Sequence, residues 1–122
     1  MKLRIRGNSL RIRLSKTEVD ELASGSSLTE YTNFGSSTFS YKVQPVGNGE
    51  ALTATYEKNM VTLNVPTALL ADWPTNSVVG FESMMPLGDS KHLHLLLEKD
   101  FKCIDKTMED QSDFFENPAK TC

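Results

Sequence analysis

The chain has 122 residues, of which 39% are hydrophobic and 24% charged, and its formal net charge is −3 at pH 7. These values are typical of one soluble globular domain that buries about two-thirds of its extended-chain surface. No apolar run approaches the roughly 20 residues of a membrane-spanning helix, and the first residues have a strand pattern instead of a secretory signal. We therefore expect a single domain over residues 1–122, in the cytoplasm and without a membrane contact.

Two cysteines, Cys103 and Cys122, are present, and they form no CxxC motif. A reducing cytoplasm favours free thiols, whereas an oxidising compartment would allow a disulfide that ties down the C-terminal tail. The sequence leaves both states open.

The first stretch alternates apolar and polar residues on both sides of Gly7-Asn8. This pattern predicts two half-buried strands, residues 2–6 and 9–14, joined by a type II′ turn. The two-residue loop fixes a register in which Arg4 faces Arg11. One face of the hairpin is therefore apolar, and the other carries five cations: Lys2, Arg4, Arg6, Arg11 and Arg13.

A helix is predicted directly after this hairpin. Ser15 and Glu18 have the spacing of a capping box, in which each side chain accepts a hydrogen bond from an amide that the helix start leaves free. Leu14 and Val19 fit a hydrophobic staple, and Gly25 is placed to end the helix.

Six further strands and a second helix follow. Strand patterns occur at residues 28–34, 39–43, 52–56, 61–65, 78–81 and 92–98. Pro66 to Trp73 is expected to form the helix, because proline suits a first helical turn and the residues after it favour or tolerate a helix. We expect loops at residues 45–49 and 84–90.

The two halves of the chain have similar patterns. With an offset of 51 residues, apolar positions coincide: Leu10 with Val61, Ile12 with Leu63, Leu22 with Trp73 and Leu28 with Val79. This predicts a pseudo-repeat with halves 1–45 and 50–98, followed by a tail at 105–122. The expected fold class is mainly β (α+β), with two ββαββ units that close into one small barrel or sandwich of about eight strands, a short helix at each end. Side chains fill an interior of this size, so we expect no large ligand cavity.

Charge is distributed unevenly along the chain. Residues 1–16 carry six cations and no acid, whereas residues 105–116 carry five acids and one lysine. Like charges opposed across strands are unfavourable, so we expect the acidic tail to fold back over the cationic face, with Phe114 and Phe115 packed at the sheet edge. If that face is free instead, its cations could bind nucleic acid or another polyanion through phosphate contacts.

The stretch from Gly7 to Leu14, followed by a short helix, resembles the swapped-hairpin DNA-binding antitoxins and regulators of the AbrB type, with an echo at residues 59–73. The resemblance implies nucleic-acid binding through the basic hairpin. The second copy departs from this pattern, because uncharged side chains stand where the first copy has cations: Thr53, Thr55, Thr62 and Asn64.

One strand pattern places His92, His94 and Glu98 on a single face, at a spacing that could bind a divalent metal ion. The string at 92–98 also resembles half of the cupin motif, HxH followed by glutamate, but the following glycine and a third histidine are absent. The leucines between these residues are expected to point from the opposite face of the strand into the core. The alternative is therefore a strand with two solvent-facing histidines.

Motifs of nucleophilic catalysis are absent from the sequence, since it has no GxSxG elbow, no cysteine beside a base and no glycine-rich phosphate loop. The acidic run at 109–113 lacks the spacing and the glycine of a calcium loop. These absences favour a non-enzyme and leave a metal-dependent enzyme as the alternative, and we expect no cofactor apart from a divalent metal in that alternative.

Both ends of the chain resemble one known family. The matching segments are residues 4–11, 98–103, 109–113 and 117–118. They are similar to a family of short bacterial proteins classed only as a domain of unknown function. The resemblance implies a cytoplasmic bacterial protein and brings no activity with it. We expect a non-catalytic binding or protein-interaction module with an unidentified protein partner; nucleic-acid binding and a metal site are the alternatives.

Overall fold

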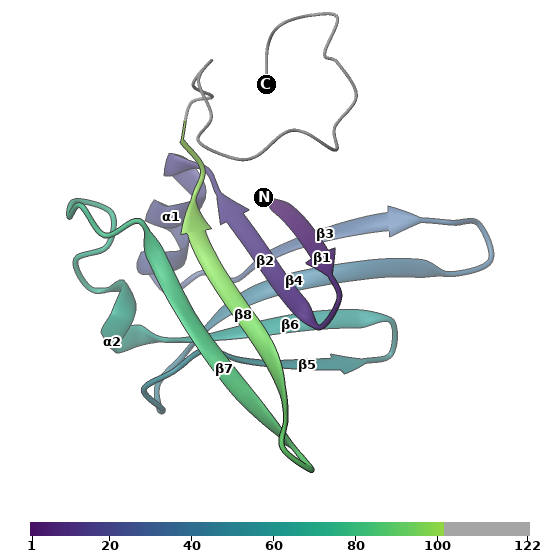
Figure 1. Ribbon diagram of the computed structural model, residues 1–122. Coiled ribbons are helices and arrows are strands. Elements are labelled where there is room, and N and C mark those ends of the chain that lie inside the picture. The colour runs from purple at the N-terminus through teal and green to yellow at the C-terminus, as the bar shows by residue number, and fades with distance from the viewer. Residues whose placement is uncertain (102–122) are drawn as a thin grey trace, which may run out of the picture.

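The structure is a computed structural model that describes residues 1–101. Within them it contains eight strands and two short helices, arranged as two four-stranded sheets (Figure 1). The helices are α1 (Lys16–Ala23) and α2 (Thr67–Leu70), and the strands are β1 (Lys2–Arg6), β2 (Ser9–Leu14), β3 (Leu28–Asn33), β4 (Thr38–Val46), β5 (Thr53–Glu57), β6 (Met60–Pro66), β7 (Gly80–Gly88) and β8 (Lys91–Lys99). The predicted mainly β class is confirmed, and the two sheets form a sandwich, not a closed barrel.

Each sheet combines one hairpin from the first half of the chain with one from the second half. Sheet A has the strand order β1-β2-β8-β7, and sheet B has the order β3-β4-β6-β5. The hairpins meet along a parallel pair at the centre of each sheet, β2 with β8 and β4 with β6. The two expected ββαββ units therefore exchange hairpins, and neither unit forms a sheet of its own. The cause is that each helix carries the chain from one sheet to the other.

The two helices contact each other on one side of the sandwich, and they do not close its opposite ends as expected (Figure 1). Leu22 of α1 and Trp73, which follows α2, are both fully buried. The indole Nε1 of Trp73 donates a hydrogen bond to the carbonyl oxygen of Val78 at 2.9 Å. Its ring packs against Phe81, with the ring centroids 4.9 Å apart.

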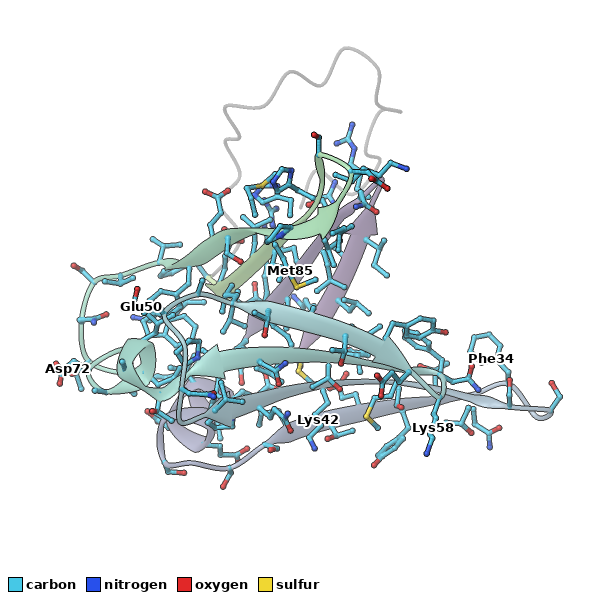
Figure 2. All side chains as sticks on the ribbon, turned by 90° about the horizontal axis from the view of Figure 1, so that it is seen from below. Phe34, Lys42, Glu50, Lys58, Asp72 and Met85 are labelled. Carbon is cyan, nitrogen blue, oxygen red and sulfur yellow. The ribbon has the colours of Figure 1, made fainter. Side chains whose placement is uncertain are left out.

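The core lies between the sheets and is formed by alternate residues of the four central strands. These buried residues are Leu10, Ile12, Leu14, Val43, Val61, Leu63, Val65, Leu95 and Leu97. Met85 of the edge strand β7 points between the sheets, where its Sδ accepts a hydrogen bond from the amide of Ala54 at 3.3 Å (Figure 2). Lys42 points away from sheet A, on the outer face of sheet B (Figure 2).

The first hairpin and its helix form as predicted. The five facing pairs of β1 and β2 include Arg4 with Arg11, and Gly7 has a φ of +55°, which suits the first central position of a type II′ turn. In the capping box the Ser15 amide donates to Glu18 Oε1 at 2.8 Å, and the Glu18 amide donates to Ser15 Oγ at 3.3 Å.

The largest difference from the sequence prediction is β7, which runs through residues 84–88, where the pattern predicts a loop. Pro86 and Gly88 weaken the strand signal, but β7 is an edge strand, where proline is tolerated. Only Asp89 and Ser90 form the turn to β8, both with positive φ. Val79 precedes β7 and is 52% exposed, so its predicted correspondence with buried Leu28 is wrong.

Two other boundaries also differ. The second helix covers four residues instead of the predicted 66–73, because Pro66 is the last residue of β6. Strand β4 extends to Val46 and enters the predicted loop at 45–49, where its pairing with β6 continues.

Within residues 1–101, no helix has the length and apolar character that crossing a membrane requires. The described residues do not include either cysteine, Cys103 or Cys122. They also do not include the acidic segment at 105–116, which contains Phe114 and Phe115. The expected fold-back of the tail over the cationic face therefore stays a prediction.

Candidate functional site: the outer face of sheet A

All eight residues that the sequence offers as site candidates project from the same face of sheet A. Strand β2 lies parallel to β8, with Arg13 beside Glu98 and Ser9 beside His94. Because side chains alternate along a strand, the candidates of both strands point away from the core. The structure thus joins two separate predictions on one surface: Lys2, Arg4, Arg6, Arg11 and Arg13 with His92, His94 and Glu98.

The five cations form a stripe along β1 and β2, called the basic stripe below. Part of its charge is neutralised by acids of β8 and of the residue after it. Glu98 Oε1 lies 3.3 Å from Arg11 Nε and 3.6 Å from Arg13 Nε. Lys2 Nζ lies 2.8 Å from Asp100 Oδ2, and this hydrogen bond, against a smaller opposite effect of burial, lowers the pKa of Asp100 below its ordinary value.

Arg4 and Arg6 differ from the rest of the basic stripe, because no carboxylate within residues 1–101 forms an ion pair with either of them. Both side chains are exposed. Arg4 also faces Arg11, and the Arg11 Nε is enclosed without a well-aligned hydrogen bond, although Glu98 lies at ion-pair distance. The stripe therefore keeps unneutralised positive charge that a bound anion could stabilise.

The predicted metal ligands share this face but contact other groups. His94 Nε2 lies 2.5 Å from Glu82 Oε2, on β7, and Glu98 contacts the two arginines. His92 is exposed, and its carbonyl oxygen accepts a hydrogen bond from Asn8 Nδ2 at 2.7 Å. In the described part of the chain, no three His, Cys, Asp or Glu side chains are grouped so that they could hold a metal ion. The metal site stays a prediction that this geometry does not favour.

A comparison with protein families gives a match over nearly the whole chain. The model of a family of unknown function, DUF7009, matches residues 1–119. The chain belongs to this family. No curated protein and no solved structure gives a significant match. The resemblance to a domain of unknown function is thereby confirmed. Membership of DUF7009 assigns no activity to the chain. The AbrB-type resemblance stays a prediction.

The site of this DUF7009 chain also contains residues that the sequence did not single out. Beside the basic stripe, the outer face continues with Leu96 of β8 and with Met84 and Pro86 of β7, called the apolar strip below. Met84 is 56% exposed. Glu82, Met84 and Pro86 were missed because β7 was predicted to end at residue 81, and without β7 nothing placed Leu96 beside them. The turn-forming pair Asp89-Ser90 is the signal that could have indicated a hairpin there.

Proposed function

We propose that this DUF7009 chain is a non-catalytic binding module whose contact surface for an acidic protein partner is the outer face of sheet A. The observation that carries the proposal is the juxtaposition of the basic stripe with the apolar strip, across the parallel pairing of β2 with β8. Arginine and methionine are both enriched at protein interfaces, where arginines pair with carboxylates and apolar side chains lose contact with water.

The distribution of charge supports a protein partner over nucleic acid. The cations are confined to two strands, and Glu82, Glu98 and Asp100 lie on or beside the same sheet. These acids would repel a phosphate backbone, which extends along its binding surface with one charge at each nucleotide. An acidic protein segment needs to meet only Arg4 and Arg6, and it can cover the apolar strip at the same time.

A charge-reversal experiment tests this proposal. A photoreactive residue at position 84 is used to cross-link the chain in an extract of its source cells, once in the unchanged background and once with Arg4→Glu and Arg6→Glu. The matched control is Lys42→Glu, on the outer face of sheet B. We expect one dominant cross-linked protein, with a yield at least about tenfold lower in the double variant and unchanged in the control, since reversal turns two attractions into repulsions. Equal yields in all three backgrounds would refute the proposal.

The nucleic-acid alternative uses the same face and is separated by its salt dependence. Fluorescence anisotropy with a labelled random-sequence DNA duplex measures binding at 50 and 200 mM salt. Binding that depends on Arg4 and Arg6, with log K falling by roughly 0.9 per phosphate contact for each unit of log salt, would favour nucleic acid as the partner. No measurable binding at 50 mM salt agrees with a protein partner.

A further inference from the structure

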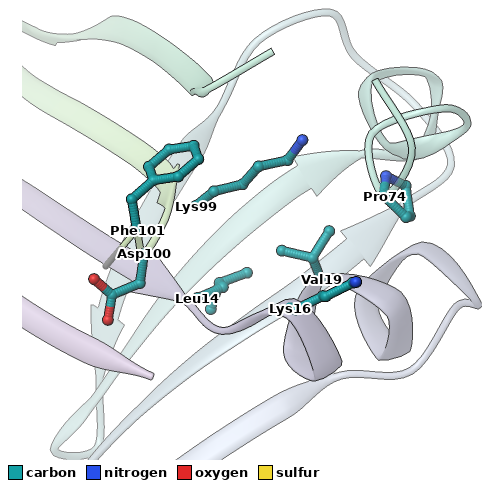
Figure 3. A pocket seen from close by; sticks show the side chains of 7 residues that line it. All are labelled: Leu14, Lys16, Val19, Pro74, Lys99, Asp100 and Phe101. Atoms are coloured by element: carbon teal, nitrogen blue, oxygen red, sulfur yellow. The ribbon is translucent and has the colours of Figure 1, made fainter. Parts of the chain in front are cut away.

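A pocket lies beside α1, away from the basic stripe. It is a pocket of about 330 Å³ where the end of β2, the first turn of α1, the segment after α2 and the end of β8 meet (Figure 3). Its lining consists of Leu14, Lys16, Val19, Pro74, Lys99, Asp100 and Phe101. None of the five cations of the basic stripe belongs to the lining, and the volume is at the lower end of the range for small-molecule sites.

One part of the pocket wall is apolar. Leu14 and Val19 belong to the buried core and form the inner wall, while Pro74 and Phe101 stand at the sides (Figure 3). Phe101 is 63% exposed, although its ring lines the pocket. A hydrocarbon group in the pocket would remove part of this ring from water, and burial of apolar surface is the general driving force for such binding.

The other part of the wall is cationic. Lys16 makes no ion pair or side-chain hydrogen bond with residues 1–101, and it lies beside Val19 at the pocket (Figure 3). Lys99 is held in place, because its Nζ donates to the carbonyl oxygen of Asn76 at 2.8 Å and lies 5.8 Å from the centre of the Trp73 ring. Lys16 and Lys99 thus add two cationic side chains to the pocket lining, next to its apolar part.

Among residues 1–101, Asp100 is the one acid of the lining, and it does not cancel these charges. Asp100 is paired with Lys2 at 2.8 Å, and its carboxylate points away from the ammonium groups of Lys16 and Lys99 (Figure 3). We infer that the pocket binds a small amphiphilic anion, whose apolar body lies against Val19 and Phe101 and whose carboxylate meets Lys16. A medium-chain fatty acid or a monoaromatic carboxylate has this chemistry.

Trp73 supplies a built-in reporter, because it is the only tryptophan of the chain and its ring lies under Lys99. The test titrates the full chain with sodium decanoate, below micelle formation, and follows the Trp73 emission. Decanol, which has the same alkyl chain without the charge, is the matched ligand control. We expect saturable binding of decanoate that is about two- to fivefold tighter than that of decanol, the range for one partly exposed charge contact.

Two variants assign the contact to the pocket. Lys16→Gln should weaken decanoate binding by about two- to fivefold and leave decanol binding unchanged. Lys42→Gln, on the outer face of sheet B, should change neither. Equal affinities for decanoate and decanol, or an Lys16→Gln chain that binds decanoate unchanged, would overturn the inference. The absence of any titration would overturn it as well.

Discussion

The carboxylate of Glu18 links the first residue of the chain to the start of α1. Its Oε1 accepts the Ser15 amide of the capping box, and its Oε2 accepts a hydrogen bond from the amine of Met1 at 2.7 Å. Burial raises the pKa of Glu18, but the contacts with the Met1 amine and Ser15 together outweigh it and leave the pKa below its ordinary value of 4.5. The ionised carboxylate is therefore favoured by folding, and it stabilises the protein above the unfolded-state pKa.

This cluster predicts an acid-dependent loss of stability. Because the folded pKa of Glu18 is the lower one, its contribution is complete above about pH 4.5 and is lost as the pH falls through the folded value. Glu18→Gln keeps an oxygen that can accept the Ser15 amide but removes the charge beside the Met1 amine, so it should lower the free energy of unfolding by about 0.5–1 kcal/mol at pH 7, the size of a partly exposed ion pair, and by clearly less at pH 3. Urea unfolding at both pH values measures this. Glu21→Gln, on the exposed side of α1, is the control; an equal loss in both variants would contradict the assignment.

At the scale of single elements, Gly80 decides how closely β7 can approach β8. A Cβ built on Gly80 would lie 2.8 Å from the Cα of Glu98 and against the backbone oxygen of Leu97. Both neighbours belong to the backbone of the paired strand, so they cannot turn away as a side chain would. The strand pair that carries Glu82 and the apolar strip therefore needs glycine at this position.

We expect Gly80→Ala to destabilise the chain by about 1–3 kcal/mol, the usual cost of forcing an extra carbon into a closely packed site. Gly47→Ala is the matched control, because Gly47 has no atom within 4 Å of the added Cβ and no positive φ. Thermal unfolding of both variants measures the difference. If Gly80→Ala is as stable as the control, β7 and β8 are not paired in this register.

Local patterns explain why some elements were predictable and others were not. The hairpin of β1 and β2 was predicted down to each pair, because a two-residue turn fixes its register through neighbouring residues alone. The pairing of β2 with β8 joins residues more than 80 positions apart, and no local pattern encodes it. For this reason the sequence offered Arg13 and Glu98 as members of two different sites, whereas the structure makes them partners.

At the scale of the whole molecule, sheets A and B have the same connectivity. Sheet A consists of the hairpins β1-β2 and β7-β8, and sheet B consists of the hairpins β5-β6 and β3-β4. In each sheet the two hairpins meet along a central parallel pair. The fold class followed from alternation and from eight expected strands, but the exchange of hairpins between sheets did not, because both arrangements bury the same apolar residues. The predicted repeat itself stays a prediction, and this exchange provides a way to test it.

The exchange implies that neither half of the chain can complete a sheet alone. We expect fragments 1–49 and 50–122, separated within the exposed loop between β4 and β5, to lack a cooperative unfolding transition when each is studied by itself. Each fragment exposes the apolar residues of its hairpins and the unpaired edges of β2 and β4, or of β6 and β8. Mixed at equal concentration, they should form a 1:1 complex with the circular dichroism spectrum of the intact chain.

The stability of that complex should depend on concentration, because separate chains lose the advantage of a covalent link. Analytical ultracentrifugation of each fragment and of the mixture distinguishes the outcomes. A homodimer of fragment 1–49 would support the repeat directly. In such a dimer the β1-β2 hairpin of the second copy would take the place of β5-β6 beside β4, and its β3-β4 hairpin would take the place of β7-β8 beside β2. A fragment 1–49 that unfolds cooperatively as a monomer would show that one half closes on itself, and the exchanged topology would be wrong.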